Sequence, residues 1–182
     1  MQFIALAPLI FVNIWHGLVI LTAWRKGKAW RSISESALAS CRLLWTHRIV
    51  HTLGAVCLFG LAVCMWPVAR FQFPAILLIF AVVLDITQAF ALSKNTRHAP
   101  MNLCDIHQLT AWMMAGAYLL FSILFMQATG ATNSAVVAYV VWLFSVYAWS
   151  SLTKHRHFWL TQMVFFLSVG AAIATCVGNM KL

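Results

Sequence analysis

The chain has 182 residues, of which 63% are hydrophobic and only 8% are charged, and its formal charge is +9. This composition excludes an ordinary soluble domain. The basic residues lie in short loops beside apolar runs, so they indicate a membrane orientation and no nucleic-acid partner. Only three residues are acidic, which disfavours chemistry that needs paired carboxylates or a magnesium site.

Six apolar stretches follow one another along the chain, and each is close to the roughly 20 residues that a helix needs to cross a bilayer. We predict spans at 3–24, 49–68, 73–92, 106–128, 134–152 and 158–178. The longest polar segment, 25–48, is expected to be an amphipathic stretch at the membrane surface. Short connections favour antiparallel neighbours. The predicted fold is therefore all-α: one polytopic membrane domain, 1–182, with six transmembrane helices in an up-down bundle.

The charges give this bundle an orientation. Ten of the twelve Lys and Arg residues fall in the loops 25–48, 93–105 and 153–157, and only Arg70 and Lys181 lie on the other side. The positive-inside rule makes the basic side cytoplasmic, so both termini are expected outside. We expect a protein integral to a bacterial inner membrane, in contact with the lipid bilayer. Its protein partners would be other membrane subunits or a second copy of the chain.

Polar residues inside a membrane are costly, so each one needs a structural or functional reason. The cytoplasmic halves of the predicted spans carry such residues: Asn13, His16, Arg48, His51, Asp85, Gln88 and His107. Counted from the span ends at 1.5 Å per residue, His51 and His107 lie about 3 Å deep. Asp85 lies about 10 Å deep and His16 about 12 Å deep by the same count.

A carboxylate at this depth must be protonated, hydrogen-bonded or paired. His16 lies at nearly the same depth as Asp85, so a contact between the two is expected. Asn13 and Gln88 each lie three residues from one member of this pair, on the same helix face. A purely structural role and a proton relay are both compatible with such a cluster. The remaining histidines are expected near the membrane interface: His47, His98, His155 and His157.

The equal depth of His51 and His107 predicts a second kind of site. Two imidazoles from facing helices can hold the iron of a b-type haem. Arg48 and Arg97 would then meet the haem propionates at the cytoplasmic surface. This arrangement requires the second and fourth spans to be neighbours, although they are not consecutive.

Two short segments resemble known haem-binding helices. Arg48-Ile49-Val50-His51 is similar to the first helix of prokaryotic b-type cytochromes, in which an Arg-x-x-His opens a span and the His binds haem. His107-Gln108-Leu109-Thr110-Ala111-Trp112, followed by Gly116 and Tyr118, resembles a helix of the copper-resistance D and membrane protoporphyrinogen oxidase families. These resemblances imply a haem b and a redox or electron-transfer subunit, with His51 and His107 as iron ligands.

Two other functions stay open. An Asp and a His at mid-depth suit a proton-coupled transporter or channel. A non-catalytic membrane scaffold or assembly subunit is the third alternative. Ile33-Ser34-Glu35, together with a His that opens the fourth span, resembles six-helix families of the FRAG and autophagy-modulator type. An absorbance spectrum separates the haem hypothesis from the other two.

Overall fold

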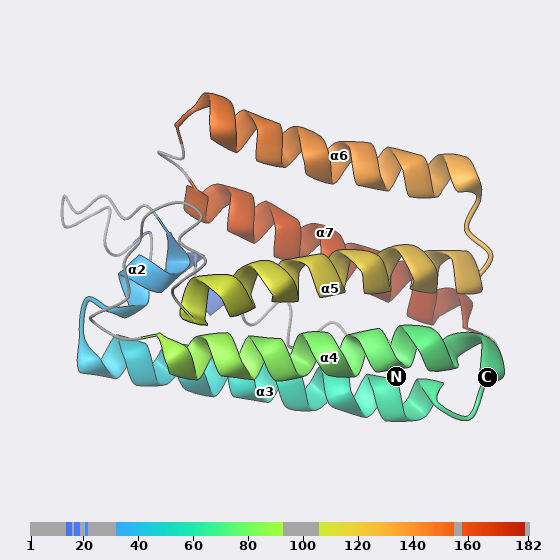
Figure 1. Ribbon diagram of the computed structural model, residues 1–182, viewed down its shortest axis with the longest axis horizontal. Coiled ribbons are helices and arrows are strands. Elements are labelled where there is room, and N and C mark those ends of the chain that lie inside the picture. The colour runs from blue at the N-terminus through green and yellow to red at the C-terminus, as the bar shows by residue number, and fades with distance from the viewer. Residues whose placement is uncertain are drawn as a thin grey trace.

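The computed structural model describes residues 32–92, 106–154 and 158–180, together with five isolated helical residues between 14 and 21. Six helices follow in chain order within these ranges (Figure 1). They are α2 (Ile33–Ala37), α3 (Cys41–Met65), α4 (Ala69–Ala91), α5 (Ile106–Ala128), α6 (Asn133–Leu152) and α7 (Phe158–Asn179). The predicted span 3–24, with Asn13 and His16, lies outside the described residues apart from those five.

The five long helices confirm the helical character of five predicted spans. Each is long and apolar enough to cross a membrane. The helix α5 has the predicted bounds 106–128, and the ends of α6 and α7 differ from the prediction by one residue at most. The all-α fold class is thus confirmed for the described residues.

The helix that contains the second predicted span extends beyond it at the N-terminal end. The helix α3 begins at Cys41, eight residues before the predicted start at 49. Ser40 caps it, because the Ser40 hydroxyl accepts a hydrogen bond from the amide of Leu43 at 3.2 Å. The prediction was based on hydropathy, which detects apolar segments. The first two turns of α3 contain polar residues between 42 and 48, so hydropathy did not detect them.

The long helices alternate in direction, as in an up-down bundle (Figure 1). α3 packs on α4, α4 packs on α5, α5 packs on α7, and α6 lies on the outside against α7. One end of the bundle carries α2 and the starts of α3, α5 and α7; we call it the α2 end. The other end carries the turns between α3 and α4 and between α5 and α6; we call it the turn end.

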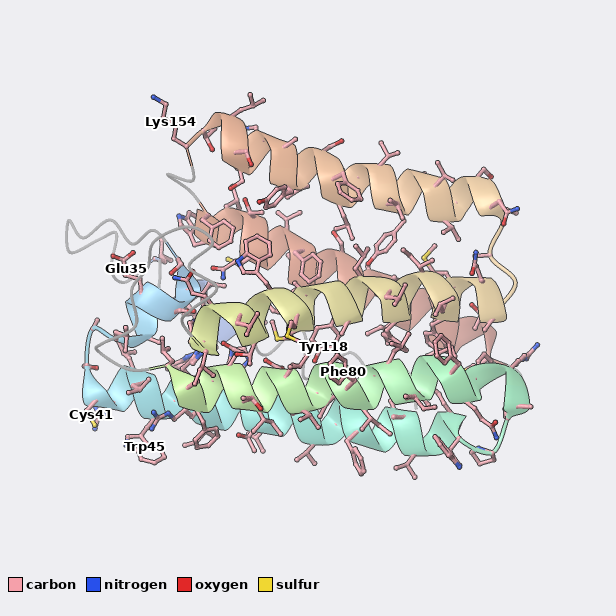
Figure 2. The ribbon with its side chains drawn as sticks, in the orientation of Figure 1. Glu35, Cys41, Trp45, Phe80, Tyr118 and Lys154 are labelled. Carbon is pink, nitrogen blue, oxygen red and sulfur yellow. The ribbon has the colours of Figure 1, made fainter. Side chains whose placement is uncertain are left out.

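The interior changes in character from one end to the other. Toward the turn end it is closed by aromatic rings without any exposure: Phe121 stacks on Phe125 at 5.3 Å, and Phe71 meets Phe125 edge-on at 5.7 Å. Toward the α2 end the buried set includes His47, His51, Asp85, Gln88 and His107. Figure 2 shows other polar and charged side chains at this end, among them Glu35 and Lys154. The core is therefore polar in one half and apolar in the other.

Candidate functional site

The carboxyl group of Asp85 is the centre of the buried polar cluster. Asp85 is 6% exposed and lies on α4, between α3 and α5. One of its oxygens, Oδ1, lies 2.7 Å from Nδ1 of His51 on α3 and 3.2 Å from Nε2 of Gln88. The other oxygen lies 3.5 Å from the hydroxyl of Tyr118, which belongs to α5. Side chains of three helices thus converge on one carboxyl group.

The chemistry of the groups fixes which atoms donate. An ionised carboxylate only accepts hydrogen bonds, so the Nδ1–H of His51 and the amide N–H of Gln88 both donate to it. The contact of 3.4 Å between Nε2 of Gln88 and Nδ1 of His51 then brings two donors together, and it is no hydrogen bond.

A second histidine connects this cluster to α2. Nδ1 of His107 lies 2.7 Å from the backbone carbonyl of Gln88, which can only accept, so this nitrogen carries a proton. Nε2 of His107 lies 3.0 Å from Oγ of Ser34. In the neutral ring Nε2 is an acceptor, and the Ser34 hydroxyl donates to it. Both nitrogens of His107 are therefore engaged by the protein.

A third histidine adjoins the cluster. His47 lies one turn before His51 on α3, its ring centroid is 4.2 Å from that of His51, and it is only 2% exposed. The sequence analysis placed His47 at the interface because the predicted span began at 49. The sequence feature that could have predicted this position is the spacing of four residues between His47 and His51, which puts both histidines on one helix face. Nevertheless, no group of three or more potential metal-binding side chains occurs among the residues of the described ranges.

Arg48 caps the C-terminal end of α4. Its guanidinium donates to the carbonyls of Phe90 at 3.4 Å and Leu92 at 3.3 Å, at the C-terminal end of α4. It also lies over the rings of Trp45 and Phe90, 5.1 and 5.3 Å from their centroids. A cation at a helix C-terminus satisfies the last carbonyls and complements the helix dipole. Arg97, the other predicted partner of haem propionates, lies outside the described residues.

The two predicted iron ligands occupy different positions along their helices. Because α3 begins at Cys41, His51 lies ten residues into its helix, about 15 Å from the start. His51 thereby reaches Asp85, whose expected partner His16 lies outside the described residues. His107, as the second residue of α5, contacts Gln88 instead. Asp85 and Gln88 are three residues apart, about 4.5 Å along α4, so the two histidines do not lie at equal depth.

The arrangement does not fit a haem held by His51 and His107 together. α4 lies between α3 and α5, so the two helices are not the neighbours that this haem requires. Iron binding by Nε2 of His107 would also displace its contact with Ser34. His51 taken alone has one feature of a metal-bound imidazole, the carboxylate at Nδ1, but its ring is 3% exposed and packs against His47. A carboxylate that holds the Nδ1–H of a histidine is a common second shell of such ligands.

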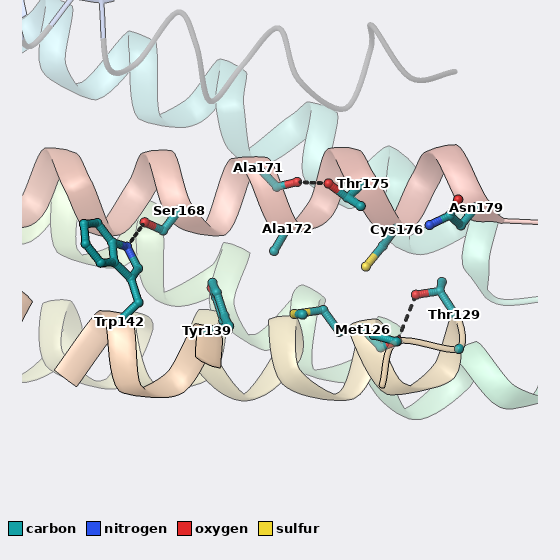
Figure 3. A pocket seen from close by; sticks show the side chains of 12 residues that line it. Met126, Thr129, Tyr139, Trp142, Ser168, Ala171, Ala172, Thr175, Cys176 and Asn179 are labelled. Carbon is teal, nitrogen blue, oxygen red and sulfur yellow. Dashed lines mark hydrogen bonds between the residues drawn. The ribbon is translucent and has the colours of Figure 1, made fainter. Parts of the chain in front are cut away.

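A cavity away from the His51–Asp85 pair is lined by parts of α5, α6 and α7, with Tyr139 and Cys176 in its wall. It has a volume of about 390 Å³ and lies at the turn end, between α6 and α7 (Figure 3). Hydroxyl, amide and apolar groups line it, and none of the described residues around it is charged. The indole of Trp142 donates to Oγ of Ser168 at 2.9 Å across this gap. Without a titratable carboxylate or histidine in its wall, the cavity is not the chemical centre of the molecule.

Comparisons with protein-family models, with curated proteins and with solved structures find no match for this chain. The functional argument therefore depends on the geometry of the site.

Proposed function

We propose that this chain is an integral membrane protein in which His51 and Asp85 bind and release a proton, as in a proton-coupled transporter. The observation that carries the proposal is the buried contact of 2.7 Å between Nδ1 of His51 and Oδ1 of Asp85. Ionisable residues inside membrane-spanning helices are expensive and are typical of proton relays and ion pathways. A histidine and a carboxylate in hydrogen-bond contact can pass a proton between them.

The two halves of the interior support access from one side. The polar side chains lie toward the α2 end, and the stacked rings of Phe71, Phe121 and Phe125 fill the core toward the turn end. Protons would thus reach the His51–Asp85 pair from the α2 end. A transporter that alternates between two sides must be closed on at least one of them at any time, and an apolar aromatic core provides that closure. An open channel is disfavoured by the same packing.

The orientation belongs to the same proposal. The α2 end faces the cytoplasm of a bacterial inner membrane, because the positive-inside rule places the basic loops there. A periplasm-dependent reporter such as alkaline phosphatase, fused after Gly130, is expected to be active. The same reporter fused after Lys154 is the control, and it is expected to be inactive. The opposite pattern of activity would reverse the orientation and the side of proton entry.

Infrared spectroscopy tests the proton-binding role directly. The chain has only three acidic side chains, so substitutions can assign their carboxyl bands when the protein is in lipid vesicles, which contain no other protein. Between about pH 4 and pH 9, difference spectra are expected to contain a band of the Asp85 carboxyl group or the His51 ring. Asp85→Asn should remove this response, and Glu35→Gln should retain it. If neither Asp85 nor His51 titrates in this range, the pair is structural and the scaffold function is favoured.

A single haem at His51 is the second candidate function, and the carboxylate behind the ring of His51 favours it. The haem would supply electron transfer. Here His51 would be an iron ligand oriented by Asp85, and His107 would keep its contacts with Gln88 and Ser34. The absorbance spectrum of the same preparation decides between the two proposals. A Soret band that His51→Ala abolishes and His107→Ala retains supports the haem, and a spectrum without it supports the proton-binding role alone.

A further inference from the structure

A short helix closes the α2 end of the bundle over the polar cluster. Four of the five residues of α2 are buried: Ile33, Ser34, Ser36 and Ala37. Such burial is unusual for a helix of barely more than one turn, which has little stability of its own. Ser32 caps it by accepting from the amide of Glu35 at 3.1 Å. Contacts with the long helices must therefore hold α2 in place.

Two of these contacts are polar and come from different helices. The hydroxyl of Ser34 lies 3.0 Å from Nε2 of His107 on α5. The backbone amide of Ile33 donates to Oε1 of Gln162 on α7 at 3.0 Å. In Figure 1, α2 lies at the end where α5 and α7 begin. The position of α2 thus depends on a histidine and an amide that project from the bundle.

The contact with His107 continues to the proposed proton site. His107 donates to the backbone carbonyl of Gln88, and the side chain of Gln88 donates to Asp85. Asp85 in turn accepts from His51. This series of contacts, which passes through the covalent bonds of Gln88 between its backbone carbonyl and its side chain, connects a residue of α2 to the His51–Asp85 pair across α5, α4 and α3. Such a series can couple the two ends only if one of its helices can adopt two positions. The small helix α2 is the best candidate, because a helix with few contacts needs the least free energy to move.

We infer that α2 is a movable cap which controls access of protons and water to the His51–Asp85 pair, and that the contact between Ser34 and His107 holds it closed. The regulatory role of the cap rests on the proposed proton binding by His51 and Asp85. The closed position of the cap rests on the contacts alone. His51 and Asp85 are 3% and 6% exposed, and α2 approaches the pair through His107 on α5. Movement of α2 would expose the end of the bundle from which protons enter.

Two serines of α2 allow a matched test. Ser34→Ala removes the hydroxyl that contacts His107. Ser36→Ala removes an equally small group, which donates within α2 to the carbonyl of Ile33 at 2.6 Å. Both serines are buried, at 8% and 1% exposure, and alanine favours the helix in each case. The two variants therefore differ mainly in the contact with α5.

The measurement is the rate at which diethyl pyrocarbonate modifies His51 in the full chain in nanodiscs, followed by peptide mass spectrometry at fixed pH. Ser34→Ala is expected to raise this rate about five- to tenfold, the range that corresponds to loss of one buried hydrogen bond that opposes opening. Ser36→Ala should change it less than about twofold. Gln162→Ala should raise it in the direction of Ser34→Ala, because it frees the amide of Ile33.

Equal rates for the Ser34 and Ser36 variants would overturn the cap. A melting temperature within a few degrees of the unsubstituted protein confirms that each variant is folded. The modification rate reports access and does not require that Asp85 titrate. A rise in rate without a titrating infrared band would retain the cap and reject the proton-binding function, and the reverse pattern would retain the function and reject the cap.

Discussion

Asp85→Leu is expected to lower the free energy of unfolding by about 3–5 kcal/mol, the usual cost of removing one partner of a buried charged pair. The substitution leaves the buried donors of His51 and Gln88 without their acceptor. It also removes the acceptor of the Tyr118 hydroxyl. Asp85→Asn should cost less, because the amide oxygen still accepts one of these hydrogen bonds. Equilibrium unfolding in mixed micelles measures both differences.

Thr87→Leu is the matched control for this effect. Thr87 lies two residues further along α4 and is exposed, so the same helix receives the same leucine on its outer face. A change within about 0.5 kcal/mol is expected there. If Asp85→Leu proves as stable as Thr87→Leu, the three contacts of Asp85 contribute nothing to the fold and the buried cluster loses its significance.

Phe125→Ala is expected to destabilise the protein by about 3–5 kcal/mol. Phe125 has no exposed surface and packs against both Phe71 and Phe121 in the apolar half of the core. Its removal leaves a cavity whose walls lose their dispersion contacts, which are the main attraction between helices in a lipid environment. Loss of this closure should also admit water from the turn end, which hydrogen–deuterium exchange of α5 would detect.

Phe144→Ala provides the comparison at a surface position. Phe144 lies on α6 and is 61% exposed, so alanine there exchanges one set of lipid contacts for another. Its effect should stay below about 1 kcal/mol. Similar losses of stability for Phe125 and Phe144 would mean that the aromatic cluster is not a packed core, and the proposed one-sided access would lose its physical basis.

The apolar runs of the sequence were sufficient to predict the five long helices. A helix that crosses a membrane satisfies all its backbone hydrogen bonds internally, so an apolar run of sufficient length is a nearly complete signal. The segment 106–128 has the same bounds in the prediction and in the structure. The sequence also singled out Asp85 and Gln88, because polar residues within apolar runs stand out whatever their neighbours are.

Which of these residues contact one another could be seen only in the packed bundle. Hydropathy averages over a window, so it concealed the first two turns of α3 and set His51 too close to the helix end. It also says nothing of which helix lies beside which. α4 lies between α3 and α5, so His51 of α3 contacts Asp85 and His107 of α5 contacts Gln88. His107 also contacts Ser34 of α2. Partners across a bundle depend on the rotation of each helix and on its neighbours, and both are set by side-chain packing between segments far apart in the chain.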